Sequence, residues 1–538
     1  MLRKIRITLA IVFFSLLTLL FLDISGVLHL YFGWMAKIQL LPAVLALNLG
    51  VILFLLLLTL LFGRVYCSVI CPLGVFQDIA AWFGKKQKKN RYTYSKAISW
   101  LRYTVLVLFV AALIGGIASF VALLDPYSAY GRIASNLFAP VYRWGNNLLA
   151  FFSERAGGYA FYPVEVYVKS LPTFLIAAAT FVIIIVLAWR NGRTYCNTVC
   201  PVGTLLGFLS RFSWFKPVID SSQCVSCKLC ERNCKASCID IAHHQIDYSR
   251  CVACMDCIGK CPKDAIHYRH PSKRELAAGA QSVSPQSFSA KDRGMRTQNG
   301  EAVQPLDSDS GHVMQAAQSR LNVKTAAPVD TSRRKFLAAS ALLATSAALK
   351  AQEKKVDGGL AVIEDKKVPD RATRILPPGS VNARHFAKHC TGCQLCVANC
   401  PNGVLRPSTD LLHLMQPEMS YERGYCRPEC VHCSEVCPAG AIEPITVADK
   451  SATRIGHAVW IMDNCVPITD GQECGNCARH CPSGAIQMVP SEPSNPASLK
   501  IPVVNTERCI GCGACEYLCP ARPFSAIYVE GHSAHRTM

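Results

Sequence analysis

Cysteine is the residue type in this sequence best able to do chemistry, because its thiolate binds zinc or the irons of an iron–sulfur cluster. The chain has 538 residues and 29 cysteines. Most of the cysteines are grouped at Cys-x2-Cys and Cys-x3-Cys spacing, which is typical of metal ligands, whereas disulfide frameworks are expected in small secreted domains. The cysteine groups therefore predict metal binding.

Two groups lie close together in the middle of the chain. CVSCKLCERNC and CVACMDCIGKCP share Cys-x2-Cys-x2-Cys-x3-Cys spacing and contain Cys224, Cys227, Cys230 and Cys234, then Cys251, Cys254, Cys257 and Cys261. In bacterial ferredoxins with this spacing, three cysteines bind one [4Fe-4S] cube and the fourth binds the other cube. We expect Cys261 to complete the first cluster and Cys234 the second. Four-cysteine zinc sites are the alternative, but they rarely have three cysteines at intervals of three before a Cys-Pro.

Four further groups follow in the C-terminal part. They are Cys390, Cys393, Cys396 and Cys400; Cys426, Cys430, Cys433 and Cys437; Cys465, Cys474, Cys477 and Cys481; and Cys509, Cys512, Cys515 and Cys519. Each group has four thiols, so each predicts one more [4Fe-4S] cluster, six in all, with these 24 cysteines as iron ligands. The spacing does not decide which of the later groups exchange their fourth cysteines.

Five cysteines remain. Cys67 and Cys71 lie in GRVYCSVICPLG, and Cys196 and Cys200 lie in the similar GRTYCNTVCPVG. These two Cys-x3-Cys-Pro repeats could bind another cluster or metal, act as a redox dithiol, or form helix-ending turns against which the ferredoxin unit packs. Cys238 stands alone and is expected to be a small buried thiol, not a ligand.

Long apolar runs precede and separate these repeats. The chain is 51% hydrophobic and 17% charged. Runs over residues 7–22, 38–62, 104–124 and 171–189 are long enough, or nearly so, to cross a hydrocarbon core of about 30 Å as helices. The predicted fold is an α-helical membrane domain of four transmembrane helices joined to α+β ferredoxin-like [4Fe-4S] domains. The repeats follow the second and fourth runs, so a pseudo-twofold arrangement could bring their cysteines together.

Positive charges indicate the orientation. MLRKIR at the N-terminus and GKKQKKNRYTYSK after the second run are rich in Lys and Arg, which marks the cytoplasmic side. The formal net charge is +20, and six clusters would contribute roughly −12. A nucleic-acid partner is therefore not needed to explain the basic composition.

A fifth apolar run has different flanks. TSRRKFL, with Arg333 and Arg334, precedes alanine-rich residues 336–349 and is similar to a twin-arginine export signal. The predicted domains are therefore a membrane domain over 1–215, a cytoplasmic two-cluster ferredoxin over 216–265, a disordered linker over 266–330, a signal or fifth anchor over 331–352, and a periplasmic four-cluster ferredoxin over 353–538. Cleavage or retention of the signal stays open.

These motifs resemble two known protein groups. The helices with Cys-x3-Cys-Pro repeats and a two-cluster ferredoxin look like NapH of periplasmic nitrate reductase systems, and the export signal with four cluster motifs looks like the MauM/NapG group. The resemblance implies a NapH-NapG fusion in a bacterial inner membrane, multi-pass, which oxidises quinol and passes electrons to a periplasmic reductase or its cytochrome donor. Alternatives are a maturation or redox-protection factor for a metalloenzyme, or an electron donor to a different acceptor.

Quinol oxidation releases two protons, so ionisable groups near a membrane surface are candidates for a quinol site. Asp23, His29, Asp125 and Tyr127 meet this condition on the outward side, although no catalytic residue is identified. The sequence has no Cys-x-x-Cys-His motif for haem and no dinucleotide motif. The expected partners are the quinone pool, the reductase and membrane lipid. Two clusters inside and four outside leave a gap of about 30 Å, which bound quinone, the paired cysteines or another subunit must bridge.

Overall fold

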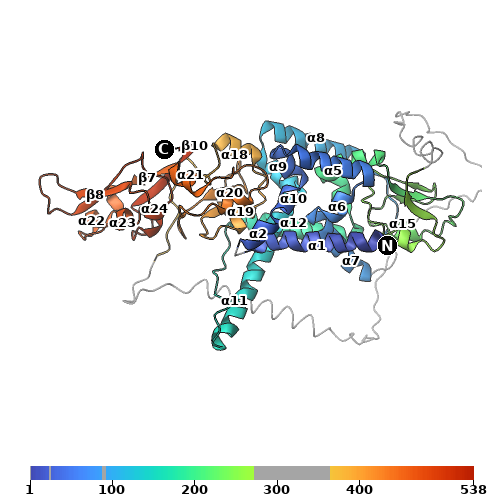
Figure 1. The fold of residues 1–538 in the computed structure, drawn as a ribbon, viewed down its shortest axis with the longest axis horizontal. Helices are drawn as coiled ribbons and strands as arrows, with labels where there is room; N and C mark the ends of the chain where they lie inside the picture. Colours follow the sequence, from blue (N-terminus) through green and yellow to red (C-terminus); the bar gives the residue numbers. More distant parts are fainter. Residues whose placement is uncertain (1, 24–25, 88–91, 272–363, 538) are drawn as a thin grey trace, which may run out of the picture. The chain divides into compact units, whose positions relative to one another are not determined.

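The computed structural model describes residues 2–23, 26–87, 92–271 and 364–537. Residues 1–279 and 366–538 belong to one compact unit. The twin-arginine segment predicted at 331–352 and the linker from residue 272 onward lie outside the described residues. Figure 1 shows the helical segment in blue to cyan and the C-terminal segment in orange to red.

Two helices in the described part of the chain are long and apolar enough to cross a membrane. They are α1 (Leu2–Leu22) and α12 (Leu171–Asn191). Two shorter apolar helices are α5 (Leu49–Phe62) and α8 (Ser99–Gly115). The prediction of four transmembrane helices is therefore shown only in part.

Each of the other two predicted spans is interrupted by a residue with positive φ and forms two helices. The run at 38–62 is interrupted after α4 (Leu40–Leu45), where Leu47 has a φ of 51° and the side chain of Asn48 accepts a bond from Val51 N to cap α5. The run at 104–124 is interrupted at Gly116, whose φ of 76° ends α8 before α9 (Ala118–Leu124). A hydropathy pattern counts apolar residues but does not register such caps.

Ten further helical segments belong to this region. They are α2 (Val27–Phe32), α3 (Trp34–Lys37), α6 (Val65–Val69), α7 (Pro72–Gln87), α10 (Pro126–Ile133), the π-helical turn η1 (Ala134–Phe138), α11 (Ala139–Arg155), α13 (Thr194–Thr198), α14 (Pro201–Leu209) and η2 (Ser210–Phe212). Helix α7 packs along α12, and the Phe76 ring lies 5.6 Å from that of Phe181 and 6.4 Å from that of Tyr130. The Cys-x3-Cys-Pro repeats thus lead into helices buried in this bundle.

The first ferredoxin region is a small α+β element. Strand β1 (Lys216–Ile219) pairs antiparallel with β4 (Ile266–Arg269), and β2 (Ile239–Asp240) pairs with β3 (Gln245–Ile246). The turns α15 (Leu229–Asn233) and η3 (Ile258–Lys260) carry cysteines between the strands. Strand β4 lies beyond the predicted domain end at residue 265, because it closes the region against β1.

The C-terminal region is also α+β. Its helices are α18 (Ala383–His389), α19 (Leu395–Ala398), α20 (His432–Val436), α21 (Val447–Ala452), the 3-10 turn η5 (Met462–Asn464), α22 (Val466–Thr469), α23 (Asn476–Arg479) and α24 (Ala514–Leu518). Its antiparallel pairs are β5 (Leu405–Pro407) with β6 (Pro417–Met419), β7 (Thr453–Trp460) with β10 (Ile527–Thr537), and β8 (Ile486–Pro490) with β9 (Lys500–Val504). Short strands and turns hold the four cysteine groups.

Candidate metal centres

The first ferredoxin cavity draws its cysteines from both motifs. Cys261 of the second motif lines this cavity together with Cys224, Cys227 and Cys230 of the first. The backbone N–H of Ala265 points at Cys261 Sγ, 3.2 Å away. Donors of this kind stabilise cluster sulfurs and tune cluster potential. The four thiols fit a [4Fe-4S] cluster.

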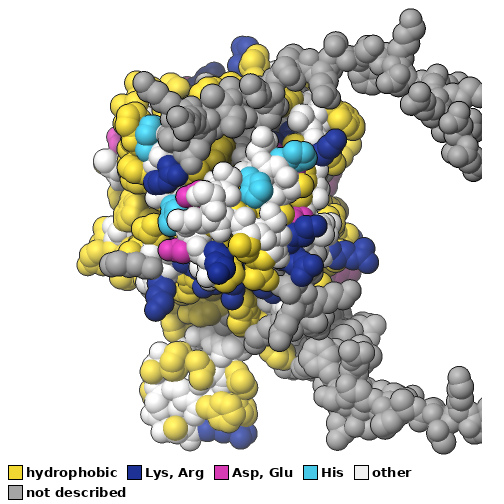
Figure 2. Space-filling model, turned by 90° about the vertical axis from the view of Figure 1, so that its right-hand side faces the viewer, with side chains coloured by type: hydrophobic (Ala, Val, Ile, Leu, Met, Phe, Trp, Pro, Cys, Tyr) yellow, Lys and Arg dark blue, Asp and Glu magenta, His cyan; other side chains and the backbone are white. Residues whose placement is uncertain are grey.

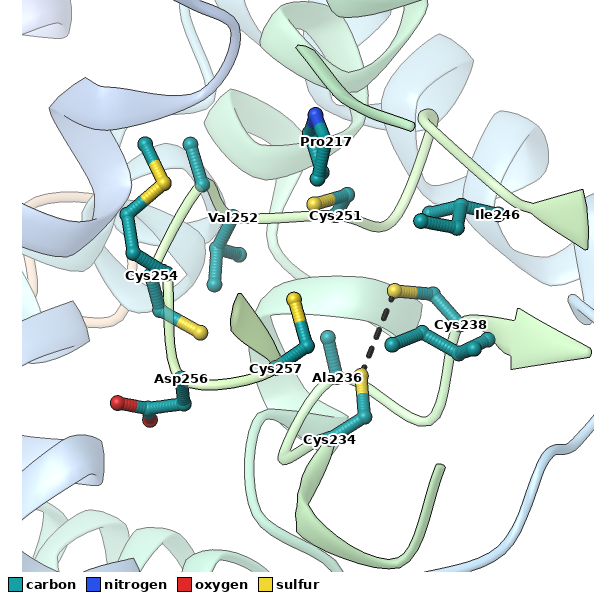
Figure 3. Close-up of a pocket in the computed structure, with 13 residues that line it drawn as sticks. Pro217, Cys234, Ala236, Cys238, Ile246, Cys251, Val252, Cys254, Asp256 and Cys257 are labelled. Atoms are coloured by element: carbon teal, nitrogen blue, oxygen red, sulfur yellow. Dashed lines mark hydrogen bonds between the residues drawn. The ribbon is translucent and has the colours of Figure 1, made fainter. Parts of the chain in front are cut away.

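A second cavity lies between the same two motifs (Figure 3). Cys251, Cys254 and Cys257 line it with Cys234, the fourth cysteine of the first motif. Cys238 lines it as well, and its Sγ lies 3.5 Å from that of Cys234. Five thiols therefore surround a cavity in which a cube needs four.

Cys238 is a candidate residue that sequence reasoning set aside. It is buried beside Cys234, with Cys251 within electrostatic range on its other side. The signal was present in the sequence, because Cys238 follows Cys234 at the same Cys-x3-Cys spacing that links Cys230 to Cys234. The fold therefore brings this fifth thiol to the cavity of the second motif.

Charged side chains fix the second cavity to the helices. Lys235 Nζ lies 3.0 Å from Asp256 and 3.1 Å from Asp78 of α7, and Arg3 of α1 lies 2.8 Å from Asp256. Burial opposes ionisation of Asp256, but Lys235 and Arg3 outweigh it and lower the pKa of that carboxyl. The loop that carries Cys254 and Cys257 is thus held against α1 and α7 by ion pairs.

Figure 2 shows the end of the molecule that carries this ferredoxin region, with Lys and Arg side chains distributed among hydrophobic and polar ones. In this ferredoxin region Lys228, Lys260 and Lys263 are exposed, as is the predicted ligand Cys227. An electron donor or acceptor could approach the first cluster closely at Cys227.

The C-terminal groups exchange their fourth cysteines in the same way. Cys437 lines one cavity with Cys390, Cys393 and Cys396. Electrostatic contacts place Cys400 with Cys426 and Cys433, Cys481 with Cys509 and Cys512, and Cys519 with Cys465 and Cys477. The structure therefore answers a question that spacing left open: the first two groups exchange fourth cysteines, and so do the last two.

Thiols of neighbouring C-terminal sites lie within electrostatic range of each other, which gives the order of the sites. Cys396 is within electrostatic range of Cys433, Cys426 of Cys512, and Cys515 of Cys477. The backbone N–H of Cys426 also donates to Cys512 O at 2.9 Å. This gives the order of the four sites, from the one containing Cys390 to the one containing Cys465.

The four repeat cysteines converge in the helical region. Cys67, Cys71, Cys196 and Cys200 are each 2–3% exposed, and electrostatic contacts link Cys71 and Cys200 to Cys67 and Cys196. Each pair lies where a short helix, α6 or α13, meets a longer one, α7 or α14. The pseudo-twofold convergence expected from the repeated sequence is present in the structure.

Two arginines cross between the repeats. Arg64 of the first repeat donates to Cys196 O at 3.3 Å, and Arg193 of the second donates to Cys67 O at 2.7 Å. Arg64 also donates to Ser249 O of the ferredoxin region, at 3.0 Å. The repeats therefore hold the ferredoxin region as well as each other, so the docking interpretation of the repeats and their use as ligands are compatible.

The candidate quinol residues lie on the side of the C-terminal ferredoxin. Asp23 accepts bonds from Gly26 N and Leu28 N and lies 3.6 Å from His29, which is within electrostatic range of His432. Asp125 accepts bonds from Ser128 and caps α10, a structural role. The buried Tyr127 hydroxyl has no hydrogen-bond partner among the described residues and is within electrostatic range of Cys393. Tyr127 and Asp125 are both within electrostatic range of the Cys393 site.

The donor sets fit iron–sulfur clusters. Backbone N–H groups point at the sulfurs of fourth cysteines in three ferredoxin sites, from Ala265 to Cys261, from Ala485 to Cys481 and from Ala526 to Cys519, at 3.2–3.3 Å. Over the described ranges, no three His, Cys, Asp or Glu side chains surround a single metal ion. Each thiolate of a cube binds a different iron, so four cube ligands lie further apart than the ligands of one zinc ion.

Three family models match parts of the chain. A 4Fe-4S binding domain of the type Fer4_5 matches residues 44–90 and 173–219, which contain the Cys-x3-Cys-Pro repeats. A 4Fe-4S dicluster domain, Fer4_7, matches residues 472–522, and a further 4Fe-4S binding domain, Fer4, matches residues 244–267. Iron–sulfur binding is therefore supported in the helical region and in both ferredoxin regions.

Several curated proteins are similar to part of the chain. The methylamine utilization ferredoxin-type protein MauM of Methylobacillus flagellatus is 31% identical over 166 residues, which cover 30% of this chain and 70% of that protein. The ferredoxin-type protein NapG of Escherichia coli K12 is 28% identical, covering 30% and 75% of the two chains, and NapF of the same organism is 27% identical, covering 29% and 87%. No solved structure matches.

These relatives share cluster motifs with the chain and cover a third of it or less, so they do not test the fusion with a NapH-like part. The cysteine cavities, the backbone donors to their sulfurs and the family models agree on iron–sulfur electron transfer. The chain belongs to the family of ferredoxin-type iron–sulfur proteins that includes MauM.

Proposed function

We propose that this protein spans a bacterial inner membrane and passes electrons from quinol toward a reductase on the periplasmic side, with nitrate reductase as the first candidate acceptor. The chain acts as the electron-transfer component of a quinol dehydrogenase. Quinol gives up two electrons and two protons and becomes quinone. The electrons pass one at a time through the clusters, and the protons go to water at the membrane surface.

One observation carries this proposal: α1 joins the two ferredoxin regions at its opposite ends. Near its N-terminus, Arg3 pairs with Asp256 beside Cys254 and Cys257 at 2.8 Å. Near its C-terminus, Leu20 O accepts a bond from Asn399, beside Cys396 and Cys400, at 3.1 Å. A helix of 21 residues is about 30 Å long, close to the thickness of a hydrocarbon core.

This arrangement supports opposite sides of a membrane for the two ferredoxin regions. Ion pairs join one region to α1 through Arg3 and to α7 through Asp78. The C-terminal region contacts the other end of the bundle through Asn399 and through a bond from Asn136 to Gln394 at 2.8 Å. The outward surface of α1, α5, α8 and α12 carries many exposed large apolar side chains, among them Leu9, Leu53, Val107 and Val182. Such a surface suits lipid.

The quinol site is proposed beside Tyr127. Its hydroxyl is buried, has no hydrogen-bond partner and lies within electrostatic range of Cys393, Cys396 and Cys437. A quinol oxygen that accepted a bond from Tyr127 would be close to the first C-terminal cluster. Asp23 and His29, paired at 3.6 Å on the same side, are candidates for carrying protons to the surface.

The test uses the complete protein, purified in detergent without oxygen and oxidised before use. A reduced water-soluble quinol analogue should reduce clusters, seen as new paramagnetic resonance signals, whereas the oxidised quinone should not. Tyr127→Phe should slow this reduction at least tenfold without changing the iron content. A full iron content with no reduction by quinol at any concentration would contradict the proposal.

A second acceptor class is favoured by the relatives. Two proteins named for methylamine utilization are 31% and 32% identical to part of the chain, slightly more than NapG at 28%. The acceptor could therefore belong to a methylamine utilization system. Mixing the reduced protein with each oxidised partner and following cluster reoxidation separates the two, because the true partner should react at low micromolar concentration.

A further inference from the structure

We infer that Cys67, Cys71, Cys196 and Cys200 bind a seventh [4Fe-4S] cluster inside the helical region, between the two ferredoxin regions. Its existence is independent of the electron donor, while its role as a relay rests on the proposed function. The inference assigns four ligands, two from each repeat. It also assigns positioning roles to Arg64, Arg193 and Gln77.

The position of the four thiols is the first support. All four are buried, and Cys67, Cys71 and Cys200 share one packed core with Cys254 of the first ferredoxin region and Cys393 of the second. The pairs Cys67–Cys71 and Cys196–Cys200 come from separate repeats and remain within electrostatic range of each other. Free thiols at such a position are ready ligands for a buried cluster.

The second support is a buried positive charge without a matching carboxylate. Arg64 is fully buried, and its bonds go to neutral groups, Asn197 Oδ1 and Ser249 O at 3.0 Å and Cys196 O at 3.3 Å. Its Nε has no partner, and one Nη lies 3.8 Å from Cys67 Sγ. A buried cation is costly unless an anion is nearby. An oxidised cube with four thiolates carries about two negative charges, which would balance Arg64.

Arg193 occupies the equivalent place in the second repeat. It donates to Cys67 O at 2.7 Å, and its Nε pairs with Asp78 at 2.7 Å. Asp78 is shared with Arg6 and Lys235, at 3.0 and 3.1 Å. These contacts place three cations around one carboxylate, so this side of the cysteine group also carries net positive charge. An anionic cluster fits both halves.

Donors to sulfur are the third support. Gln77 Nε2 lies 3.2 Å from Cys196 Sγ, and Gly203 N lies 3.3 Å from Cys200 Sγ. The second contact resembles the N–H groups that point at fourth cysteines in the ferredoxin sites. Hydrogen bonds to sulfur stabilise cluster thiolates and raise the reduction potential.

One glycine in each repeat, Gly74 or Gly203, keeps the pair of cysteines of that repeat in place. A Cβ on Gly74 would lie 2.2 Å from Cys67 O, and one on Gly203 would lie 2.4 Å from Cys196 O. Each loop therefore folds back on its own first cysteine so closely that a side chain is excluded. The guanidinium of the opposite repeat closes the loop, since Arg193 and Arg64 lie 2.9 Å from the same two Cβ positions. The sequence Cys-Pro-x-Gly thus forms half of a preorganised four-thiol site.

The relay needs one reactant besides quinol, a one-electron reductant that reduces the ferredoxin region at Cys254, because quinol oxidised beside Tyr127 would reduce the site at Cys393 directly. A reduced cluster in the ferredoxin region at Cys254 loses one electron as the seventh cluster gains it, and the seventh cluster is reoxidised as the site at Cys393 is reduced. Tyr195, within electrostatic range of Cys200, and Tyr127, within range of Cys393, lie between these sites. The intermediate cluster divides a crossing of about 30 Å into shorter steps.

The test is an iron and acid-labile sulfide count on the complete protein, purified without oxygen. Seven clusters give about 28 irons per chain, and six give about 24. Replacing all four repeat cysteines by alanine should remove about four irons and one set of paramagnetic resonance signals. The matched control is Ser68→Ala, which lies between Cys67 and Cys71 and whose hydroxyl donates locally to Val65 O; it should keep about 28.

If the four-alanine variant does not accumulate, the count on the unaltered protein and Gln77→Leu still decide the matter. Gln77→Leu should keep the iron but lower the midpoint potential of one cluster. A count of about 24 in the fully loaded protein, or an unchanged count in the four-alanine variant, would overturn the inference. Failure of quinol to reduce clusters in a protein with about 28 irons would overturn the proposed function and leave the seventh cluster standing.

Discussion

The ferredoxin regions and the helical region both assemble four thiols by sharing cysteines between repeats, but they divide them differently. A ferredoxin site takes three cysteines from one motif and one from its partner, as Cys437 joins Cys390, Cys393 and Cys396. The helical site takes two from each repeat, with Arg64 and Arg193 crossing between the halves. A single local loop supplies three of the four thiols of a ferredoxin site, whereas each repeat supplies only two of the four thiols in the helical region.

This difference has consequences for stability and for redox tuning. A three-plus-one site depends mainly on local sequence, so short loops with little apolar core can build it once the cluster binds. A two-plus-two site depends on the packing of α7 and α14 and on buried ion pairs. Damage to one repeat should therefore affect the whole helical region, while damage to one ferredoxin ligand should affect one cluster.

The largest expected effect follows from removing an arginine that bonds across the two Cys-x3-Cys-Pro repeats. Arg193→Met removes the bonds to Cys67 O and Asp78 and leaves that carboxylate with less compensation. Loss of one partner from a buried pair costs about 3–5 kcal/mol, a large share of a typical domain's stability of about 5–15 kcal/mol. Thermal unfolding followed by circular dichroism in detergent should show a lower midpoint and a low yield.

The control for this variant is Arg190→Met, which is exposed near the C-terminal end of α12, three residues before Arg193. It changes charge equally but breaks no buried contact, so its midpoint should stay within a few degrees of that of the unaltered protein. Equal midpoints for the two variants would show that the arginine crossing does not hold the repeats together.

The next effect tests the three-plus-one arrangement by paired substitutions. If fourth cysteines are exchanged, Cys437→Ala combined with Cys393→Ala removes two ligands of the same cluster, so about four irons should be lost. Cys437→Ala combined with Cys430→Ala removes one ligand from each of two clusters, so about eight irons should be lost. Iron analysis on purified protein gives the counts, and the reverse pattern would mean that each motif keeps its own fourth cysteine.

A smaller effect concerns the spare thiol. Cys238 lies 3.5 Å from Cys234, so it can replace Cys234 as ligand. Cys234→Ala should therefore keep nearly all the iron, while Cys234→Ala with Cys238→Ala should lose about four irons. Cys230→Ala, which has no such neighbour within its cavity, is the control and should lose about four irons by itself. Equal losses from Cys234→Ala and Cys230→Ala would rule out the replacement.

The smallest effect tests the asymmetry of the helical site. Gln77 donates to Cys196 Sγ, but the equivalent position in the second repeat is Leu206. One hydrogen bond of about 0.5–1.5 kcal/mol corresponds to roughly 20–60 mV for one electron. Gln77→Leu should lower the midpoint potential of one cluster by this amount in a paramagnetic resonance titration, and Ser68→Ala should not. A shift in neither variant would place Cys196 outside any cluster.

Much of the ferredoxin chemistry was predictable from local spacing. Cys224 to Cys261 form two four-thiol groups because Cys-x2-Cys-x2-Cys-x3-Cys fixes which thiols can reach one cube, and the cavities are lined accordingly. The exchange involving Cys437 was not predictable, because similar intervals between groups allow either pairing. Cys238 was set aside although it follows Cys234 at Cys-x3-Cys spacing, because that spacing alone does not show that a turn brings the two thiols together.

The helical region was predictable in its repeats but not in its breaks. Gly-Arg at 63–64 and 192–193 indicated equivalent loops, yet only the fold shows that each arginine reaches the opposite repeat. The apolar runs at 38–62 and 104–124 predicted two further spans, but Asn48 and Gly116 divide them. Caps and left-handed residues act within single turns, which a hydropathy window averages out.

The central claim is that this one protein carries electrons across a membrane. The most direct test uses the complete protein in sealed lipid vesicles. Ferricyanide is enclosed, and a reductant that does not cross lipid is added outside. The account predicts that ferricyanide is reduced many times faster than in protein-free vesicles, and that alanine at Cys67, Cys71, Cys196 and Cys200 removes this gain while the ferredoxin clusters remain. A rate equal to that of protein-free vesicles, from protein with all its clusters in place, would contradict it.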